Sequence, residues 1–479
     1  MRDIELRIRY ERFGEVIVSY CIPNVLRFFL SIATVMLGTV IFLTKALALA
    51  PFFFILGYVC ILLTITYQTA ISRDPFNPLT LILSLGLLRF GLPYLLFYFG
   101  APRSGAQNLI RLLSLTESHL ILSHILWIIG LNALIFGWFA FPRRVSDPVD
   151  PFDFSIGPYA TVFAGLLFLF GTANIATFVH LNADILQAVK TGSFRGQQIT
   201  PGTGIYWYLG LSTISAASVM AATIIARSRA WYHVALVPGL VAMGVLWILG
   251  GRARALTPVV IVALLVWYRW FSRPDRTVQP FRILAVGAAL VPVLMWFLHL
   301  SNLYQRGFGI RSLSLSFTSF PRYVSNAVYT DIGDFQGIAG AVAVGGGVLK
   351  GNTFGVLFWP LSEGFPIGRS TGAFIVETRM GRDGFGVGPT LIGDAYVNFG
   401  LLGVIIVLSV FGLVLKWLYA QFVQHRIRPV IYAIVAVYAI RLMFESINKW
   451  SELVVVSGFT GIVVIVSVFV TTRSNPTVN

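Results

Sequence analysis

The clearest evidence for the fold class of this protein is the segment YVNFGLLGVIIVLSVFGLVLKWLYA, residues 396–420. Lys416 is its one charged residue, and its length exceeds the roughly 20 apolar residues that an α-helix needs to cross a bilayer. The glycines inside it are tolerated in membrane helices, where neighbouring helices help to satisfy the backbone. We therefore predict a membrane-spanning helix here.

The same pattern recurs along the 479-residue chain, of which 57% is hydrophobic and 11% charged. A soluble domain carries about 25% charged residues, whereas ionisable groups are costly inside a bilayer. Counting apolar runs of spanning length predicts about twelve helices. They lie at 25–44, 50–70, 79–99, 120–141, 158–180, 205–226, 231–250, 254–270, 282–300, 396–420, 429–446 and 453–471. The expected fold is an all-α polytopic membrane protein.

One hydrophilic segment, 301–390, is much longer than the other connections, and long loops in compact proteins are functional or disordered. Its aromatic residues favour an ordered loop. We expect nine spans within residues 1–300, one large extracytoplasmic loop at 301–395 and three spans within 396–479, all in a single membrane domain.

Arginine placement predicts the orientation, because cytoplasmic loops of membrane proteins are enriched in Lys and Arg. The chain carries 35 Lys and Arg against 19 Asp and Glu, a net charge of +16. If the basic N-terminus is cytoplasmic, the alternate loops that face the same way contain these arginines: Arg73, Arg143, Arg144, Arg227, Arg229, Arg269, Arg273, Arg276, Arg282, Arg426, Arg428 and Arg473. Both termini are therefore predicted to be cytoplasmic, and the excess charge needs no nucleic-acid partner.

Arg252 and Arg254 break this rule, because the segment GGRARAL (250–256) joins two spans at the outer boundary. Their side chains could reach outer lipid headgroups. The alternative is anion binding, since a guanidinium matches phosphate oxygens with two parallel hydrogen bonds.

The long loop adds further charges of both signs. Its cations are Arg306, Arg311, Arg322, Lys350, Arg369, Arg379 and Arg382, and its acids are Asp331, Asp334, Glu363, Glu377 and Asp383. Such a set could form an ordinary solvated face. Together with the two boundary arginines, it predicts a positive outward cavity suited to an anionic substrate.

Several kinds of chemistry have no motif in this sequence. The six histidines are scattered without metal-ligand spacing, and no GxxxxGK[ST] phosphate loop is present. The glycine-rich GFGVG (384–388) follows no predicted strand, which disfavours a dinucleotide site.

A family resemblance appears in GVGPTLIGDAYVNFGLLGVIIVLSVFGLVLKWLY (386–419), which resembles a C-terminal signature of the Wzy-type O-antigen and exopolysaccharide polymerases. The matching positions are Pro389, Gly393, Asp394, Tyr396, Asn398, Phe399, Gly400, Gly403 and Gly412. GGRARAL resembles the family's Gly–x–Arg element. The segment 351–368 resembles its Trp-Pro region but has Leu-Ser-Glu after Pro360, where the family often has Lys-Pro.

The resemblance implies a glycosyltransferase with a multi-span GT-C type fold in the bacterial inner membrane. Its donor would be a growing glycan on undecaprenyl pyrophosphate, and its acceptor a repeat unit on the same lipid. It implies no metal or nucleotide cofactor. A flippase and a chain-length regulator would be possible partners.

Within that reaction the charged residues take expected roles. Arginines would stabilise the leaving pyrophosphate, and a carboxylate would take the proton of the acceptor hydroxyl. The candidate bases, in order, are Asp394, Glu363, Asp334 and Asp383, and aromatic rings such as Tyr396 would stack on sugars. Asp394 also has a structural interpretation, since an acid in a first helical turn complements the helix dipole.

Three alternatives remain open at this stage. An O-antigen ligase would share the donor, but we expect a histidine in its outer loop and 301–390 has none. A flippase or transporter should show paired halves and charges deep in several spans. A scaffold without activity is the third.

Overall fold

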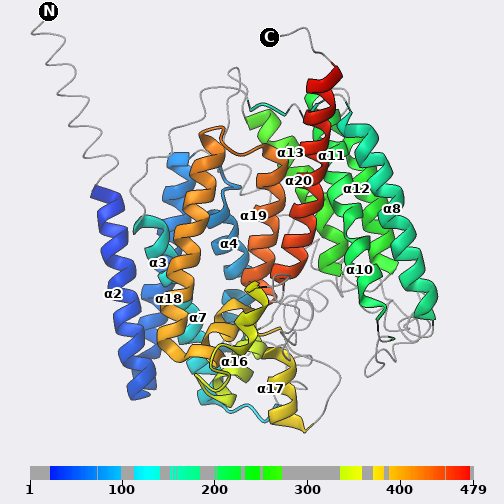
Figure 1. Cartoon of the computed structure of the whole chain (residues 1–479). Coiled ribbons are helices and arrows are strands. Elements are labelled where there is room, and N and C mark those ends of the chain that lie inside the picture. Colours follow the sequence, from blue (N-terminus) through cyan, green and yellow to red (C-terminus); the bar gives the residue numbers. More distant parts are fainter. Residues whose placement is uncertain are drawn as a thin grey trace, which may run out of the picture.

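The computed structural model describes residues 22–72, 74–98, 113–140, 152–154, 156–157, 159–183, 200, 202–227, 232–248, 252–271, 335–358, 371–381, 388–447 and 449–474. Within these ranges the protein is entirely helical, and most helices run roughly along one direction (Figure 1). This confirms the prediction of an all-α polytopic membrane protein.

Eight of the described helical segments are long and apolar enough to cross a membrane. They are Val25–Thr44, Leu47–Ala70, Pro78–Leu95, Glu117–Ala140, Ala160–Leu181, Gly204–Arg227, Thr390–Val423 and Lys449–Val470. Three shorter apolar helices are His233–Gly244, Leu256–Trp270 and Pro429–Phe444. These segments coincide with eleven of the predicted spans, and the remaining one, 282–300, lies outside the described residues.

One group of helices surrounds the buried helix α7 (Glu117–Ala140). It comprises α2 (Ile22–Thr44), α3 (Ala50–Ser72), α4 (Pro78–Gly86) and α18 (Thr390–Val423). The pair α7 and α18 is packed closely through glycine. A Cβ atom at Gly137 would lie 1.8 Å from the Ser409 carbonyl oxygen, and one at Gly412 would lie 2.2 Å from that of Leu134. Small residues allow this approach of backbones, as is common between membrane helices.

A second group surrounds α11 (Ser212–Arg227), which is rich in buried serine, threonine and alanine. Its neighbours are α8 (Ala160–Leu181), α12 (Tyr232–Ile248) and α13 (Arg252–Phe271). The helices α19 (Pro429–Phe444) and α20 (Lys449–Ser474) lie between the groups, and α20 is joined to α11 by a hydrogen bond from Ser215 Oγ to the Val456 carbonyl at 2.8 Å.

The two ends of the bundle differ. The start of α2 and the end of α20 lie at one end, whereas α16 (Phe335–Val344) and α17 (Thr371–Met380) lie at the other (Figure 1). We call the end with α16 and α17 the site end. The described part of the predicted loop is thus partly helical, and α16 packs against α7, α17 and α18.

Candidate functional site

The glycine-containing signature at 386–419 forms a broken helix at the site end. Helix α18 begins at Thr390, before the predicted span start at 396, and Gly400 interrupts it with φ 69° and ψ −163°. This conformation is open almost only to glycine. The residues from Thr390 to Asn398 are all buried, so the first part of α18 is a short half-helix enclosed by protein.

The break is repaired by a glycine-rich strap, residues 345–351. In a regular helix the carbonyls of Tyr396 and Val397 would accept bonds from residues 400 and 401. Here they accept from the amides of Gly347, at 3.0 Å, and Leu349, at 3.1 Å. A Cβ on Gly346 would lie 2.9 Å from the Gly400 Cα, so the two backbones are in contact.

The half-helix also carries a buried polar chain. Asn398 Nδ2 donates to the Asp394 carbonyl at 2.7 Å and to the Thr353 hydroxyl. The Thr371 hydroxyl donates to Thr353 at 3.3 Å. These contacts connect α18 to η8 (Asn352–Phe358) and to α17, so the Asn-Phe-Gly of the signature organises the surrounding loop elements.

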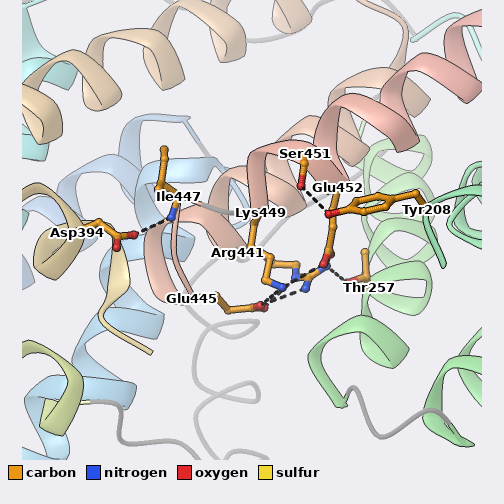
Figure 2. A network of polar contacts seen from close by, with 9 residues as sticks. All are labelled: Tyr208, Thr257, Asp394, Arg441, Glu445, Ile447, Lys449, Ser451 and Glu452. Carbon is orange, nitrogen blue, oxygen red and sulfur yellow. Dashed lines mark hydrogen bonds and ion pairs between the residues drawn. The ribbon is translucent and has the colours of Figure 1, made fainter. Parts of the chain in front are cut away.

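Asp394 is fully buried and lies beyond the first turn of α18, which contains no acid. Its structural role therefore differs from the expected dipole contact. Its Oδ2 accepts a hydrogen bond from the Ile447 amide at 2.8 Å, in the turn between α19 and α20 (Figure 2).

Four charged residues at that turn form a closed set, which we call the ion ring: Arg441, Glu445, Lys449 and Glu452. The Arg441 guanidinium holds Glu445 through Nε at 2.8 Å and Nη2 at 3.1 Å, and Glu452 through Nη1 at 2.9 Å. Lys449 Nζ lies 3.3 Å from Glu445 and 3.1 Å from Glu452. Figure 2 shows the ring beside Thr257.

The ion ring is partly buried and electrostatically balanced, with Glu445 and Lys449 half-buried. The Arg441 side chain is 7% exposed and that of Glu452 5%. Burial would raise the pKa of Glu445, but Arg441 and then Lys449 hold it below its ordinary value. Arg441 lies in the last turn of α19 and Glu452 in the first turn of α20, so each also complements a helix dipole.

The turn has further anchors from distant parts of the chain. Trp450 Nε1 donates to the Leu357 carbonyl at 3.2 Å, and the hydroxyls of Tyr208 and Ser451 lie 3.4 Å apart. Arg441 Nη1 donates to Thr257 Oγ1 at 3.4 Å. The α19–α20 turn is therefore where α13, the half-helix and the loop elements meet.

The two boundary arginines lie close to this point along the chain. Arg252 begins α13 and Arg254 is in its first turn, one turn before Thr257. The structure thus brings their helical turn close to α19, and their contact with a substrate stays a prediction.

Most of the other predicted site residues lie outside the described ranges. They are Glu363, Asp334, Asp383, Arg306, Arg311, Arg322 and Arg382. Tyr396 is described: its ring packs edge-on against Phe42 at a centroid distance of 5.7 Å, and its sugar-stacking role stays a prediction. Among the other loop cations, Arg379 donates to the carbonyls of Leu113 and Ser114.

Sequence reasoning missed the ion ring. A signal was present, because Arg441 falls inside a predicted span and intramembrane ionisable residues usually have a function. Arg89, a charged residue inside the third predicted span (79–99), lies in a π-helical segment, η3 (Leu87–Gly91), and its guanidinium stands 5.4 Å from the Phe444 ring centroid. Such π segments are frequent at functional sites.

The arrangement suits chemistry on an anionic, membrane-bound substrate. A protein-enclosed half-helix, a rigid charged turn and an arginine-bearing helix start meet at one end of the bundle. Because the ion ring is neutral as a whole, the attraction for such a substrate is expected from the arginines at the start of α13.

Comparison with known proteins gives one family match. Residues 370–473 match the family model described as O-antigen polysaccharide polymerase Wzy. No curated protein and no solved structure matches the chain. The matched segment contains α17, the broken helix α18 and the whole ion ring. The match confirms the resemblance of this chain to the Wzy-type O-antigen polymerase family.

Proposed function

We propose that this protein is a membrane glycosyltransferase that polymerises lipid-linked oligosaccharide repeat units. The observation that carries the proposal is the family match over 370–473, which coincides with the polar elements at the site end. The family is a glycosyltransferase-type polymerase that acts on lipid-linked repeat units in the membrane.

The proposed reaction transfers the growing glycan from undecaprenyl pyrophosphate to the non-reducing end of a single lipid-linked repeat unit. The acceptor hydroxyl oxygen attacks the anomeric carbon of the donor glycan. The bond from that carbon to the pyrophosphate oxygen breaks, and the leaving pyrophosphate keeps the electron pair. A carboxylate takes the hydroxyl proton.

Arg252 and Arg254 are the proposed ligands of the leaving pyrophosphate, aided by Arg306, Arg311, Arg322 and Arg382. Asp394 remains the first candidate for the base, followed by Glu363 and Asp334. Tyr396 is proposed as a sugar contact. These assignments rest on the sequence resemblance and on the place of the α13 first turn beside the ion ring.

The proposed orientation places the site end outside the bacterial inner membrane and both termini in the cytoplasm. The arginine asymmetry of the loops supports it. The described ends of α2 and α20 share one end of the bundle, opposite to α16 and α17, which agrees with such an arrangement (Figure 1).

Reconstitution tests the function directly. The purified protein in lipid nanodiscs is given an undecaprenyl-pyrophosphate-linked repeat unit alone, and the products are separated by length. A polymerase yields a ladder of glycans with free undecaprenyl pyrophosphate. A ligase would form product only when lipid A core is added, and a flippase would form no new glycosidic bond, so either result would contradict the proposal.

A further inference from the structure

The ion ring touches α13 one turn after the proposed pyrophosphate-binding arginines. Arg441 Nη1 reaches Thr257 Oγ1 at 3.4 Å, and Thr257 is buried. We infer that the ion ring is a positioning device, which fixes through Thr257 the first turn of α13 and with it Arg252 and Arg254. The inference rests on the proposed function, since it assigns these arginines to the pyrophosphate.

The first turn of α13 needs support from outside its own helix. Pro258 lies inside α13 and has no N–H, so it cannot bond the carbonyl of Arg254 four residues earlier. The proline ring also crowds that carbonyl. The turn that carries both arginines is therefore weakly tied to the rest of α13, and a contact at Thr257 lies at the junction between the two parts.

The ion ring is rigid enough to provide that support. Each cation contacts both carboxylates and each carboxylate contacts both cations, so the four side chains form a closed circuit. Two members belong to the end of α19 or its cap, and two to the start of α20. Displacing any one member would break two contacts, which keeps the guanidinium of Arg441 in one position.

The balance of charge explains why the ion ring acts through a neighbour. Its two cations are matched by two carboxylates, the buried Glu452 and the half-buried Glu445, so it adds little net positive potential for an anion. Arg252 and Arg254 start the adjacent helix with no acid in that first turn. In this proposal the ion ring is a neutral support, and Arg252 and Arg254 are the charged ligands whose helical turn it holds in place.

Two conservative variants separate this role from general stability. Thr257→Val removes the hydroxyl but keeps the shape and leaves the ion ring intact. Arg441→Lys keeps the charge but loses the fork that reaches Glu445, Glu452 and Thr257 together. The matched controls are Thr460→Val, a buried threonine of α20 that bonds the Val456 carbonyl, and Arg428→Lys, which changes an exposed ion pair at the start of α19.

Polymerisation kinetics form the first measurement. We expect Thr257→Val and Arg441→Lys to lower kcat by about tenfold or more, because small displacements of charge-stabilising groups are costly. The controls should stay within about twofold of wild type. In a background with Arg252→Lys and Arg254→Lys, Arg441→Lys should add less than about twofold, since both changes act on the same step.

Hydrogen exchange supplies a measurement that does not depend on activity. Ala255, Leu256 and Thr257 have the first amides that α13 itself can bond. We expect Arg441→Lys to speed exchange in a peptide starting at 253, which reports the amides of residues 255–257, while a peptide from the second half of α13 is unchanged. Equal exchange in wild type and variant, or independent multiplication of the kinetic effects, would overturn the inference. If only the proposed function is wrong, the wild-type protein will make no polymer. The exchange measurement will then still test whether the ion ring supports the start of α13.

Discussion

The Asp394 carboxylate accepts a hydrogen bond from the Ile447 amide at 2.8 Å, although 53 residues separate the two in the chain. One end of this bond is the half-helix of α18 and the other is the turn that bears the ion ring (Figure 2). Because Asp394 is fully buried, the bond holds the signature segment against the α19–α20 turn. Any catalytic role of Asp394 has to coexist with this structural one.

Substitution of Asp394 by Asn separates the two roles. The Asn side-chain oxygen can still accept the Ile447 hydrogen bond, but it cannot take a proton from the acceptor hydroxyl. If Asp394 is the base, Asp394→Asn should fold normally and lose about 10²–10⁴ in kcat. Near-wild-type polymerisation by a well-folded Asp394→Asn protein would leave only the structural role and turn attention to Glu363 and Asp334.

Removal of the boundary arginines tests the pyrophosphate assignment. Truncating the ligand of the leaving group to Ala, in Arg252→Ala or Arg254→Ala, should reduce kcat by about 10²–10³. Lysine should restore only part of this loss, because a point charge cannot reproduce the two parallel bonds of a guanidinium. The measurement is the initial rate of polymer formation at saturating donor; full activity in both alanine variants would favour lipid headgroups as their partners.

The spanning helices could be predicted from sequence because lipid imposes a simple rule on composition. A run such as 160–181 has the length and apolarity of a span whatever it packs against. The length and composition of a span do not predict where its backbone departs from a regular helix. Gly400 was recognised as part of a signature, yet its role in breaking α18 depends on a strap some fifty residues earlier, and no local pattern encodes that pairing.

The candidate site was predictable only in part for a related reason. Arg252 and Arg254 stand out because they oppose the charge rule for loops. Arg441 and Glu452 are much harder to recognise from the sequence. Each is a single charge near the end of a span, and only the tertiary packing brings the two together. The i,i+4 spacing of Arg441, Glu445 and Lys449 is the local signal that could have revealed them.

The conformation at Gly400 gives a stability prediction with an internal control. Gly400→Ala places a Cβ on a backbone with φ 69° and ψ −163°, which should destabilise the protein by about 1–3 kcal/mol. Gly458→Ala in α20 meets no atom within 4 Å and has no positive φ, so it should be neutral or slightly stabilising. Thermal unfolding in detergent compares the two, and equal midpoints would argue against the broken helix.

The ion ring predicts a large difference between two arginines at opposite ends of α19. Arg441→Met leaves the buried Glu452 and the half-buried Glu445 without their main partner, which should cost about 3–5 kcal/mol. Arg428→Met removes an ion pair with Asp153 whose members are 43% and 63% exposed, which should cost less than about 1 kcal/mol. Chemical unfolding of both variants against wild type measures the gap, and similar losses would contradict a buried ring.

Asp74 gives a prediction about pH, at the end of the bundle opposite to the site. Its carboxylate accepts hydrogen bonds from the Phe76 amide, Trp267 Nε1 and the hydroxyls of Tyr268 and Tyr419. Complete burial raises the pKa of this carboxyl from 3.8 to about 6, and the donors, Tyr419 first, limit the rise.

Because the pKa of Asp74 is higher in the folded protein, its protonated form is favoured by folding. The resulting stability is fully present below about pH 4 and is lost as the pH rises through about 6, and the pKa difference corresponds to about 3 kcal/mol. Asp74→Asn cannot titrate, so its unfolding free energy should fall less than that of wild type between pH 4 and 7. The free energy of unfolding of Asp74→Asn should still be lower than that of wild type, because the NH₂ group of the asparagine would face groups that are themselves hydrogen-bond donors.

The control is Asp153→Asn, a change at an exposed acid, which should keep the wild-type dependence of the unfolding free energy on pH. Parallel pH profiles for wild type and Asp74→Asn would show that this carboxyl does not titrate in that range.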